Sequence, residues 1–344
     1  MTTRRGAWIP RRTRTPCRAP SRQQARTPWR AAAIPLVLAA CVFAACAEAG
    51  RGPAPGEGYV EVEGGRVWYR VVGEGAGTPL LLLHGGPGAP SYYLEPLAAL
   101  GADRPVVFYD QLGAGRSDRP SDTTLWRVDR FVDELARVRA HLGLDEVHVL
   151  GHSWGTMLAV EYMRTDPEGV RSLVLASPAL SVRRWTEDAD RLLAMLPDSL
   201  QEAVETHEAA GTTGDPEYQA AMMEFYRRHL SLADPWPAEL LRTFDEFGTE
   251  VYEYMWGPSE FTATGTLRSY EREDFLPELD LPVLFTAGRH DEATPEAAAA
   301  YRDLVPGARL EIFENSAHMT MLDEPEAYVE AIRAFLADVE AAAP

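Results

Sequence analysis

Short apolar runs alternate with helical patterns along most of this chain, and this alternation restricts the possible fold more than any other feature. Continuous apolar runs of four to eight residues are typical of strands buried on both faces of a sheet. They occur within residues 78–88, 105–110, 146–153, 171–178 and 281–288, and a further strand is expected over residues 308–314. Helical spacing is clearest over residues 124–142, with Leu125, Val128, Val132, Leu135, Val138 and Leu142 on one face, and a last helix is expected over 325–340. Strands that alternate with helices predict a mostly parallel, doubly wound α/β sheet.

Two segments depart from this alternation. Residues on both sides of Gly64-Gly65 alternate between apolar and polar, which predicts an antiparallel hairpin. Residues 179–275 show helical periodicity without a strand-like run. We expect them to form a helical lid over the carboxyl ends of the strands, where ligands bind in open α/β sheets. The α/β core would then comprise residues 59–178 and 276–344.

The N-terminal segment differs sharply in charge from the rest. Residues 1–50 carry nine Arg and one Glu, a net +8, which leaves −27 for the remainder of a chain whose net charge is −19. The apolar run "AAAIPLVLAACVFAAC" follows the arginines and is shorter than the roughly 20 residues that span a bilayer. Residues 1–46 are therefore interpreted as a signal peptide, although a hydrophobic helix of the mature fold is the alternative.

Two cysteines in this segment resemble lipid attachment sites. "LAAC", which ends at Cys41, is similar to a bacterial lipobox, and "FAAC", which ends at Cys46, is a second candidate. We expect an exported protein that is either secreted or attached to the membrane through an N-terminal lipid. Residues 47–58, rich in Gly, Ala and Pro, would form a flexible tether.

The composition of the body excludes several partners and cofactors. Its strong negative charge repels nucleic acid and anionic membranes. No Cys follows residue 46, so disulfides and thiolate metal sites are not expected there. We find no motif for a metal, a nucleotide or a flavin, and we expect no cofactor.

The segment "VHVLGHSWGTMLA" has the order strand, G-x-S-x-G, helix. In this context the glycines allow a tight turn that exposes Ser153 above the sheet, and the following helix directs its N-terminal N–H groups toward developing negative charge. The alternative is an ordinary strand-to-helix turn. Asp291 follows the expected strand at 281–287, and His318 follows the one at 308–314, in the order that this nucleophile turn requires. Ser153, Asp291 and His318 are thus the candidate catalytic triad.

The segment "HGGPG" at residues 84–88 is the candidate for stabilising the oxyanion of a tetrahedral intermediate. A tetrahedral oxyanion needs two N–H donors, one from the residue after the nucleophile and one from an earlier strand-end loop. Trp154 and the Gly85-Gly86 backbone fit these two positions. His84 is interpreted as a structural loop residue rather than a second base.

At this point the motifs resemble a known family. "HGGPG", "YDQLGAGRSD", "GHSWGT", "WGPSEF" and "GRHDEATP" together resemble the proline iminopeptidase family of α/β-hydrolases, which includes prolyl aminopeptidases, tricorn-interacting aminopeptidases and amino-acid amidases. The resemblance extends from about Tyr59 to the C-terminus and implies the α/β-hydrolase fold. It also implies that Gly86 supplies the second oxyanion donor. Leu112 replaces the usual Arg of the "DQRG" form, which favours the amidase and tricorn-interacting branch.

The resemblance further implies that Glu260 and Glu292 bind the free α-amino group of the substrate. Neighbouring residues in an extended segment point to opposite sides, so Asp291 can face His318 while Glu292 faces the substrate. An α-amine with a pKa of about 7.7–8.0 is mostly protonated at neutral pH and pairs well with carboxylates. Alternatively, both are ordinary loop acids. An aromatic cluster could line a pocket for a proline ring or belong to the core; it consists of Tyr252, Tyr254 and Trp256.

These features predict a serine aminopeptidase that releases an N-terminal Pro or another apolar residue from short peptides or aminoacyl amides. One alternative is an amino-acid amidase or a carboxylesterase acting on small substrates. An alternative of another class is a non-catalytic α/β-hydrolase homologue that binds a ligand. Ser at the nucleophile turn argues against dehalogenases and epoxide hydrolases, which use Asp there.

Overall fold

A computed structural model describes residues 52–342 of the chain. The expected signal peptide at residues 1–46, including Cys41 and Cys46, and most of the tether lie outside the described residues. Within residues 52–342, no helix combines the length and apolar character needed to cross a bilayer.

Eight strands form one sheet in the order β1-β2-β4-β3-β5-β6-β7-β8. Strands β3 to β8 are mutually parallel, and β2 pairs antiparallel with both β1 and β4. The strands are β1 (Gly56–Val62), β2 (Gly65–Val72), β3 (Leu80–Leu83), β4 (Val106–Tyr109), β5 (Val147–His152), β6 (Val170–Ala176), β7 (Val283–Gly288) and β8 (Arg309–Phe313). The mostly parallel sheet and the hairpin at Gly64-Gly65 confirm the predicted fold class.

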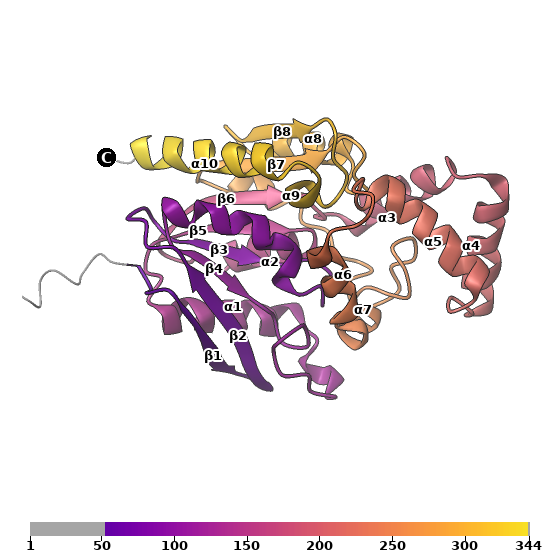
Figure 1. Cartoon of the computed structure of the whole chain (residues 1–344), viewed down its shortest axis with the longest axis horizontal. Helices are drawn as coiled ribbons and strands as arrows, with labels where there is room; N and C mark the ends of the chain where they lie inside the picture. Colours follow the sequence, from indigo (N-terminus) through magenta and orange to yellow (C-terminus); the bar gives the residue numbers. More distant parts are fainter. Residues whose placement is uncertain (1–51, 343–344) are drawn as a thin grey trace, which may run out of the picture. The chain divides into compact units, whose positions relative to one another are not determined.

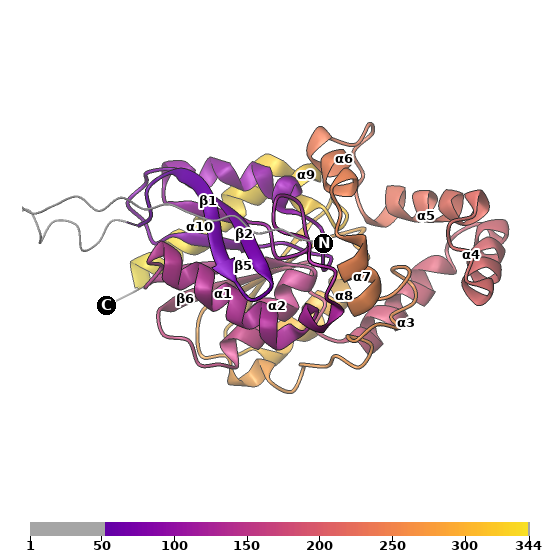
Figure 2. The same cartoon turned by 90° about the horizontal axis from the view of Figure 1, so that it is seen from below.

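Helices cover both faces of the sheet (Figures 1 and 2). One face is covered by α1 (Val128–Leu142), α2 (Trp154–Met163) and α8 (Pro295–Leu304). The other is covered by η1 (Ser91–Ala102), α9 (Thr320–Asp323) and α10 (Pro325–Ala342). Successive residues of β3 point to opposite faces of the sheet. Leu81 and Leu83 pack in the core beneath the first group of helices, and Leu80 and Leu82 pack in the core beneath the second. Burial on both faces explains why β3, β4 and β7 are continuous apolar runs, whereas β8 at the edge of the sheet is only partly buried.

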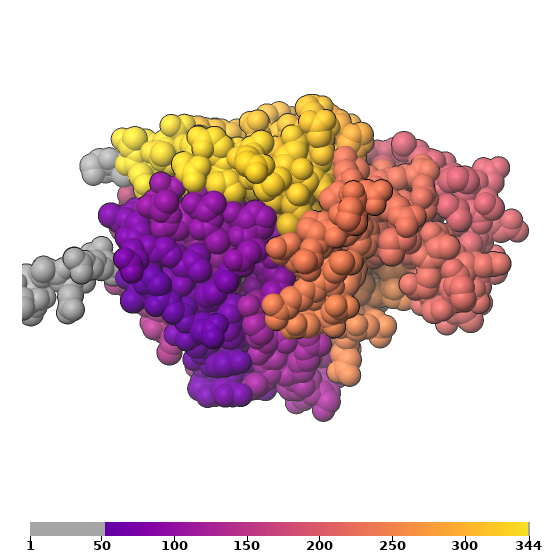
Figure 3. Space-filling model, viewed as in Figure 1, coloured from indigo at the N-terminus to yellow at the C-terminus, as the bar shows by residue number. Residues whose placement is uncertain are grey.

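The lid consists of five helices between β6 and β7: α3 (Val182–Leu193), α4 (Asp198–Ala210), α5 (Pro216–His229), α6 (Ala238–Asp245) and α7 (Thr249–Met255). A short antiparallel bridge between Ser181 and Glu271 joins the start and the end of this insertion. Figure 1 shows the helices gathered beyond the carboxyl ends of the parallel strands, and Figure 3 shows the lid packed directly against the core.

Two expected boundaries differ from the structure. Strand β1 begins at Gly56, inside the expected tether of residues 47–58, because Gly56 and Glu57 pair with Val71 and Arg70 of β2. The helix expected over 124–142 begins only at Val128. Its first residues instead form a separate 3-10 turn, η2 (Thr123–Leu125), whose first turn is capped by the Asp122 side chain, and the extended backbone of Arg127 separates it from α1.

Candidate functional site

Strand order creates a crevice at the carboxyl end of β3 and β5. The chain leaves β3 toward β4 on one side and later returns to place β5 on the other side of β3. Ligands bind at such a reversal in open α/β sheets. The loop after β3 contains Gly85 and Gly86, and β5 is followed directly by Ser153, so two candidate site segments meet at this point.

Ser153 occupies a sharply constrained turn between β5 and α2. Its backbone has φ 54° and ψ −121°, an uncommon conformation for a residue with a side chain. A Cβ at Gly151 would lie 2.2 Å from the Gly155 carbonyl oxygen, and one at Gly155 would lie 2.1 Å from the Leu83 carbonyl oxygen. Only glycine fits at these two positions, which lets the turn close tightly beneath Ser153.

Asp291 and His318 form a buried hydrogen-bonded pair. His318 Nδ1 lies 2.7 Å from Asp291 Oδ1. Asp291 is further held by the Ala293 N–H, which donates to Oδ1 at 2.8 Å, and by the Ser177 hydroxyl, which donates to Oδ2 at 2.7 Å. These donors orient the Asp291 carboxylate toward His318 and leave Nε2 as the ring nitrogen that can exchange a proton.

The segment that contains Gly86 is tied to Trp154 through Gln111. The buried Gln111 side chain donates to the His84 carbonyl oxygen at 3.0 Å and accepts from the Trp154 indole N–H at 2.8 Å. Its backbone N–H donates to His84 Nε2 at 2.8 Å. Within residues 52–342, the backbone N–H groups of Gly86 and Trp154 donate to no other protein group, so both are available to a ligand. His84 uses both ring nitrogens in this scaffold, since its Nδ1 donates to the Gly85 carbonyl oxygen at 3.0 Å.

A second chain of hydrogen bonds joins the Gly85-Gly86 segment to the His318 loop. The Gly85 N–H donates to the Tyr93 hydroxyl at 2.7 Å, and that hydroxyl lies 3.0 Å from His152 Nδ1. His152 Nε2 lies 2.9 Å from the His318 carbonyl oxygen and therefore carries the proton. Burial lowers the pKa of His152 well below its usual range. A neutral His152 thus connects two segments of the site.

Glu292 and Glu260 place two carboxylates in the same pocket as Ser153 and His318. Glu292 Oε1 lies 3.8 Å from His318 Nε2, and its Oε2 is buried without a hydrogen-bond partner among the described residues. Glu260 accepts a hydrogen bond from the Tyr252 hydroxyl at 2.6 Å. Burial raises the pKa of both carboxyl groups, well above the usual range for Glu292, where the Glu260 and Asp291 carboxylates raise it further.

The pocket wall is otherwise mostly apolar and aromatic. It includes Tyr252 and Trp256 from the predicted aromatic cluster, together with Trp185 of α3, and Gly86, Trp154, Glu260, Glu292, Ser153 and His318 also line it. Trp185 packs edge-on against His318, with ring centroids 6.0 Å apart. Tyr254 does not line this pocket and is 40% exposed, because it lies on the outer face of α7. Its predicted role in the pocket is therefore wrong.

The end of lid helix α5 is bonded to the two loops that carry Glu292 and His318. The His229 carbonyl oxygen accepts from the His318 N–H at 3.1 Å and from the Glu292 N–H at 3.3 Å. The His229 side chain adds a hydrogen bond from Nδ1 to the His290 carbonyl oxygen at 2.9 Å. This end of the lid is thus a fixed part of the site.

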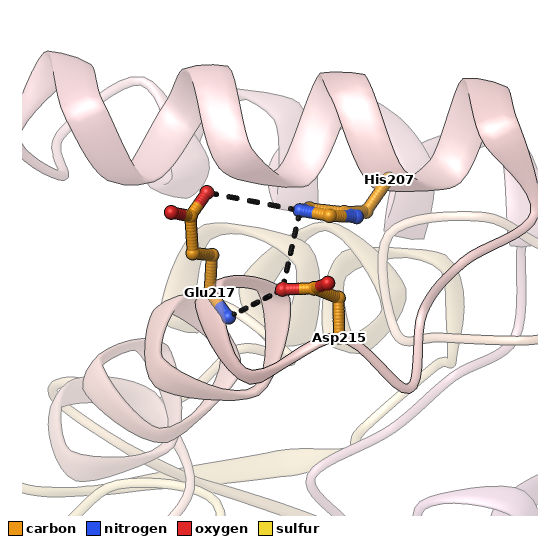
Figure 4. A group of neighbouring side chains, drawn as sticks. All are labelled: His207, Asp215 and Glu217. Carbon is orange, nitrogen blue, oxygen red and sulfur yellow. Dashed lines mark hydrogen bonds and ion pairs between the residues drawn. The ribbon is translucent and has the colours of Figure 1, made fainter.

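A separate group of potential metal ligands lies on the lid (Figure 4). His207 Nε2 lies 3.6 Å from Asp215 Oδ1 and 3.9 Å from Glu217 Oε2. The Asp215 carboxylate caps α5 by accepting from the Glu217 N–H at 2.9 Å, and the Glu217 side chain is 81% exposed. We interpret the group as ion pairs that join α4 to the start of α5.

Comparisons with known proteins agree with this geometry. Residues 78–325 match the family model described as "alpha/beta hydrolase fold". A proline iminopeptidase of Heyndrickxia coagulans is 48% identical over 282 residues, which cover 81% of this chain and 98% of that protein. The chain belongs to the proline iminopeptidase family of α/β-hydrolases.

Two solved structures are similar to this chain in both sequence and fold. The crystal structure of VinJ is 41% identical with a TM-score of 0.80, covering 83% of this chain and all of VinJ. The crystal structure of the proline iminopeptidase of Mycobacterium smegmatis is 38% identical with a TM-score of 0.78, covering 84% of this chain and all of that one. The family resemblance of the motifs is thus confirmed, and this family member is an enzyme of the hydrolase class.

Several residues of the site were not found from the sequence. Gln111 was expected only as part of a structural signature, and His152 was set aside among the other histidines. Tyr93 and Ser177 carry no motif of their own. Each of these residues contacts site residues that are distant in the sequence. Such contacts cannot be recognised from a single sequence before the fold is known. The position of His152 next to Ser153 was the one available signal.

Proposed function

We propose that the protein is a serine aminopeptidase that removes the N-terminal residue from short peptides or aminoacyl amides. Ser153 Oγ attacks the carbonyl carbon of that residue while His318 Nε2 takes the hydroxyl proton, and Asp291 stabilises the resulting imidazolium. The Gly86 and Trp154 N–H groups stabilise the oxyanion. The carbon–nitrogen bond breaks, the leaving amine takes the proton from His318, and water then hydrolyses the acyl-enzyme.

The observation that carries the proposal is the state of Glu292. A buried carboxylate without a hydrogen-bond partner is costly unless a cation completes it. Among the described residues, no arginine pairs with Glu292 or Glu260, although both face the pocket. The protonated α-amine of a substrate is a cation of suitable size, and its arrival would favour the charged form of both carboxyl groups.

Distance supports the same assignment. In an aminoacyl group the α-nitrogen lies about 2.5 Å from the carbonyl carbon, given bonds of about 1.46 and 1.52 Å and an angle of about 111°. A carboxylate that holds the amine must therefore lie close to the catalytic histidine, and Glu292 Oε1 is 3.8 Å from His318 Nε2. A second substrate residue would not fit between Glu292 and Ser153. The enzyme would therefore release one N-terminal residue at a time. The aromatic wall favours an apolar side chain such as that of Pro.

Substitution of the two carboxylates tests the proposal. Glu292→Gln and Glu260→Gln should each lower kcat/KM for an aminoacyl-arylamide with a free amine by roughly 10- to 100-fold, because each removes a charge-assisted hydrogen bond. Neither should change kcat/KM for a phenyl ester without an amine. Glu253→Gln, at an exposed position of α7, is the matched control and should leave both substrates unaffected. Equal losses on both substrates would contradict amine recognition and favour an esterase.

A further inference from the structure

The loop that presents Glu260 needs support from outside the pocket. On the pocket side, Tyr252 donates to the Glu260 carboxylate, and the Trp185 indole N–H donates to the Glu260 carbonyl oxygen at 3.0 Å. These two bonds hold Glu260 itself. They do not hold Ser259, which precedes it, or Thr262, which lies two residues after it. The hydroxyl groups of both point toward helix α4.

Glu208 of α4 binds this loop with both oxygens of its carboxylate. The Ser259 hydroxyl donates to Glu208 Oε1 at 2.5 Å, and the Thr262 hydroxyl donates to Glu208 Oε2. Tyr218 of α5 adds a third donor, with its hydroxyl 3.1 Å from Oε1. Hydrogen bonds to a charged acceptor are roughly twice as strong as those between neutral groups.

Ser259 connects these hydrogen bonds of Glu208 to residues of the pocket wall. Ser259 is buried, its hydroxyl oxygen accepts from the Phe261 N–H at 3.2 Å, and its carbonyl oxygen accepts from the Trp256 indole N–H at 3.0 Å. Trp256 and Glu260 both line the pocket, whereas Glu208 does not. The Ser259–Thr262 loop thus links Glu208 directly to the pocket wall.

Glu208 lies on a part of α4 that is held to α5 by side-chain contacts. Its neighbour His207 pairs with the first turn of α5 through Asp215 and Glu217 (Figure 4), and His207 Nδ1 lies 2.8 Å from the Thr212 hydroxyl between the two helices. The α4–α5 hairpin therefore offers a fixed carboxylate to a loop that has no regular secondary structure.

We propose that Glu208 is a positioning residue, which holds the Ser259–Thr262 loop so that Glu260 meets the substrate amine. The inference rests on the proposed function, because it assumes that Glu260 binds the amine. It assigns to α4 a part in substrate selection that a helix outside the pocket would not otherwise have.

Glu208→Ala tests the inference. It should raise KM for a free-amine aminoacyl-arylamide by roughly tenfold, with kcat changed less than about twofold, because binding of the amine is what weakens. The phenyl ester should be turned over as by the unmodified protein. Glu208→Gln should recover most of the affinity, since its amide oxygen still accepts one hydroxyl and its NH₂ can donate to the other after that hydroxyl rotates. Glu205→Ala, an exposed position one turn earlier on α4, is the matched control.

The decisive comparison combines Glu208→Ala with Glu260→Gln. If Glu208 acts through Glu260, the double variant should bind the arylamide within about twofold of Glu260→Gln alone, a non-additive result expected of coupled residues. Additive losses, or equal losses on the phenyl ester, would overturn the inference.

The remaining outcomes separate this inference from the proposed function. A normal Glu208→Ala beside an impaired Glu260→Gln overturns the positioning role alone. An unimpaired Glu260→Gln overturns amine binding by Glu260 and the positioning role with it. Should Glu208→Ala not fold, Ser259→Ala combined with Thr262→Val removes the same hydrogen bonds from the loop side and must give the same KM effect.

Discussion

Asp291 and Glu292 are neighbours in the sequence, but their carboxylates have opposite surroundings. Asp291 receives the Ala293 N–H and the Ser177 hydroxyl in addition to His318. Glu292 is equally buried, yet its Oε2 has no partner among the described residues. Hydrogen bonding thus separates a carboxylate that is bound to His318 from one whose Oε2 is left without a partner in the pocket.

The turn at Ser153 depends on single residues in a way that stability measurements can detect. Gly155→Ala would place a methyl group 2.1 Å from the Leu83 carbonyl oxygen, so the turn and β3 must separate. We expect the free energy of unfolding to fall by about 3 kcal/mol or more, the range of severe overpacking. Gly214→Ala, which meets no atom within 4 Å, should stay within about 0.5 kcal/mol. Denaturant titration distinguishes them, and a Gly155→Ala protein as stable as Gly214→Ala would contradict the proposed packing of the turn.

At the scale of elements, the parallel strands were predictable because burial on both faces leaves a continuous apolar run in the sequence. The placement of the candidate triad residues at one edge was predictable for a related reason, since parallel strands bring their carboxyl ends to one edge of the sheet. The site contacts of α4 and α5 were not predictable. Glu208 lies 51 residues from Ser259 in the chain, and its role depends on how the lid helices pack rather than on any pattern in α4.

Helices of the core and the lid are joined at Thr294. Its hydroxyl caps α8 by accepting from the Ala297 N–H at 3.2 Å and donates to Asp188 Oδ2 of α3 at 2.6 Å. Thr294→Ala should lower the free energy of unfolding by about 1–2 kcal/mol, because it removes a helix cap and leaves a buried carboxylate oxygen without its donor. Thr294→Ser keeps the hydroxyl and should lose much less. Equal stability of the Ala and Ser variants in denaturant would show that the hydroxyl contributes nothing.

At the scale of the whole molecule, the core supplies Ser153, His318, Gly86 and Trp154 to the pocket, and the lid supplies Glu260 and most of the aromatic wall. Under the proposed function, the pair formed by Glu292 of the core and Glu260 of the lid would restrict the pocket to substrates with a positive charge next to the reacting carbonyl. Selectivity for a free N-terminus is therefore the central claim about this protein.

Turnover of matched substrates with and without N-acetylation tests that claim most directly. Acetylation removes the positive charge of the α-amine and adds bulk where Glu292 and Glu260 face the pocket, while the scissile bond is unchanged. Prolyl- and alanyl-arylamides should be cleaved, and their N-acetyl forms should lose at least about 100-fold in kcat/KM, as expected when two charge-assisted hydrogen bonds are lost. Equal kcat/KM for the free and acetylated substrates would contradict the account.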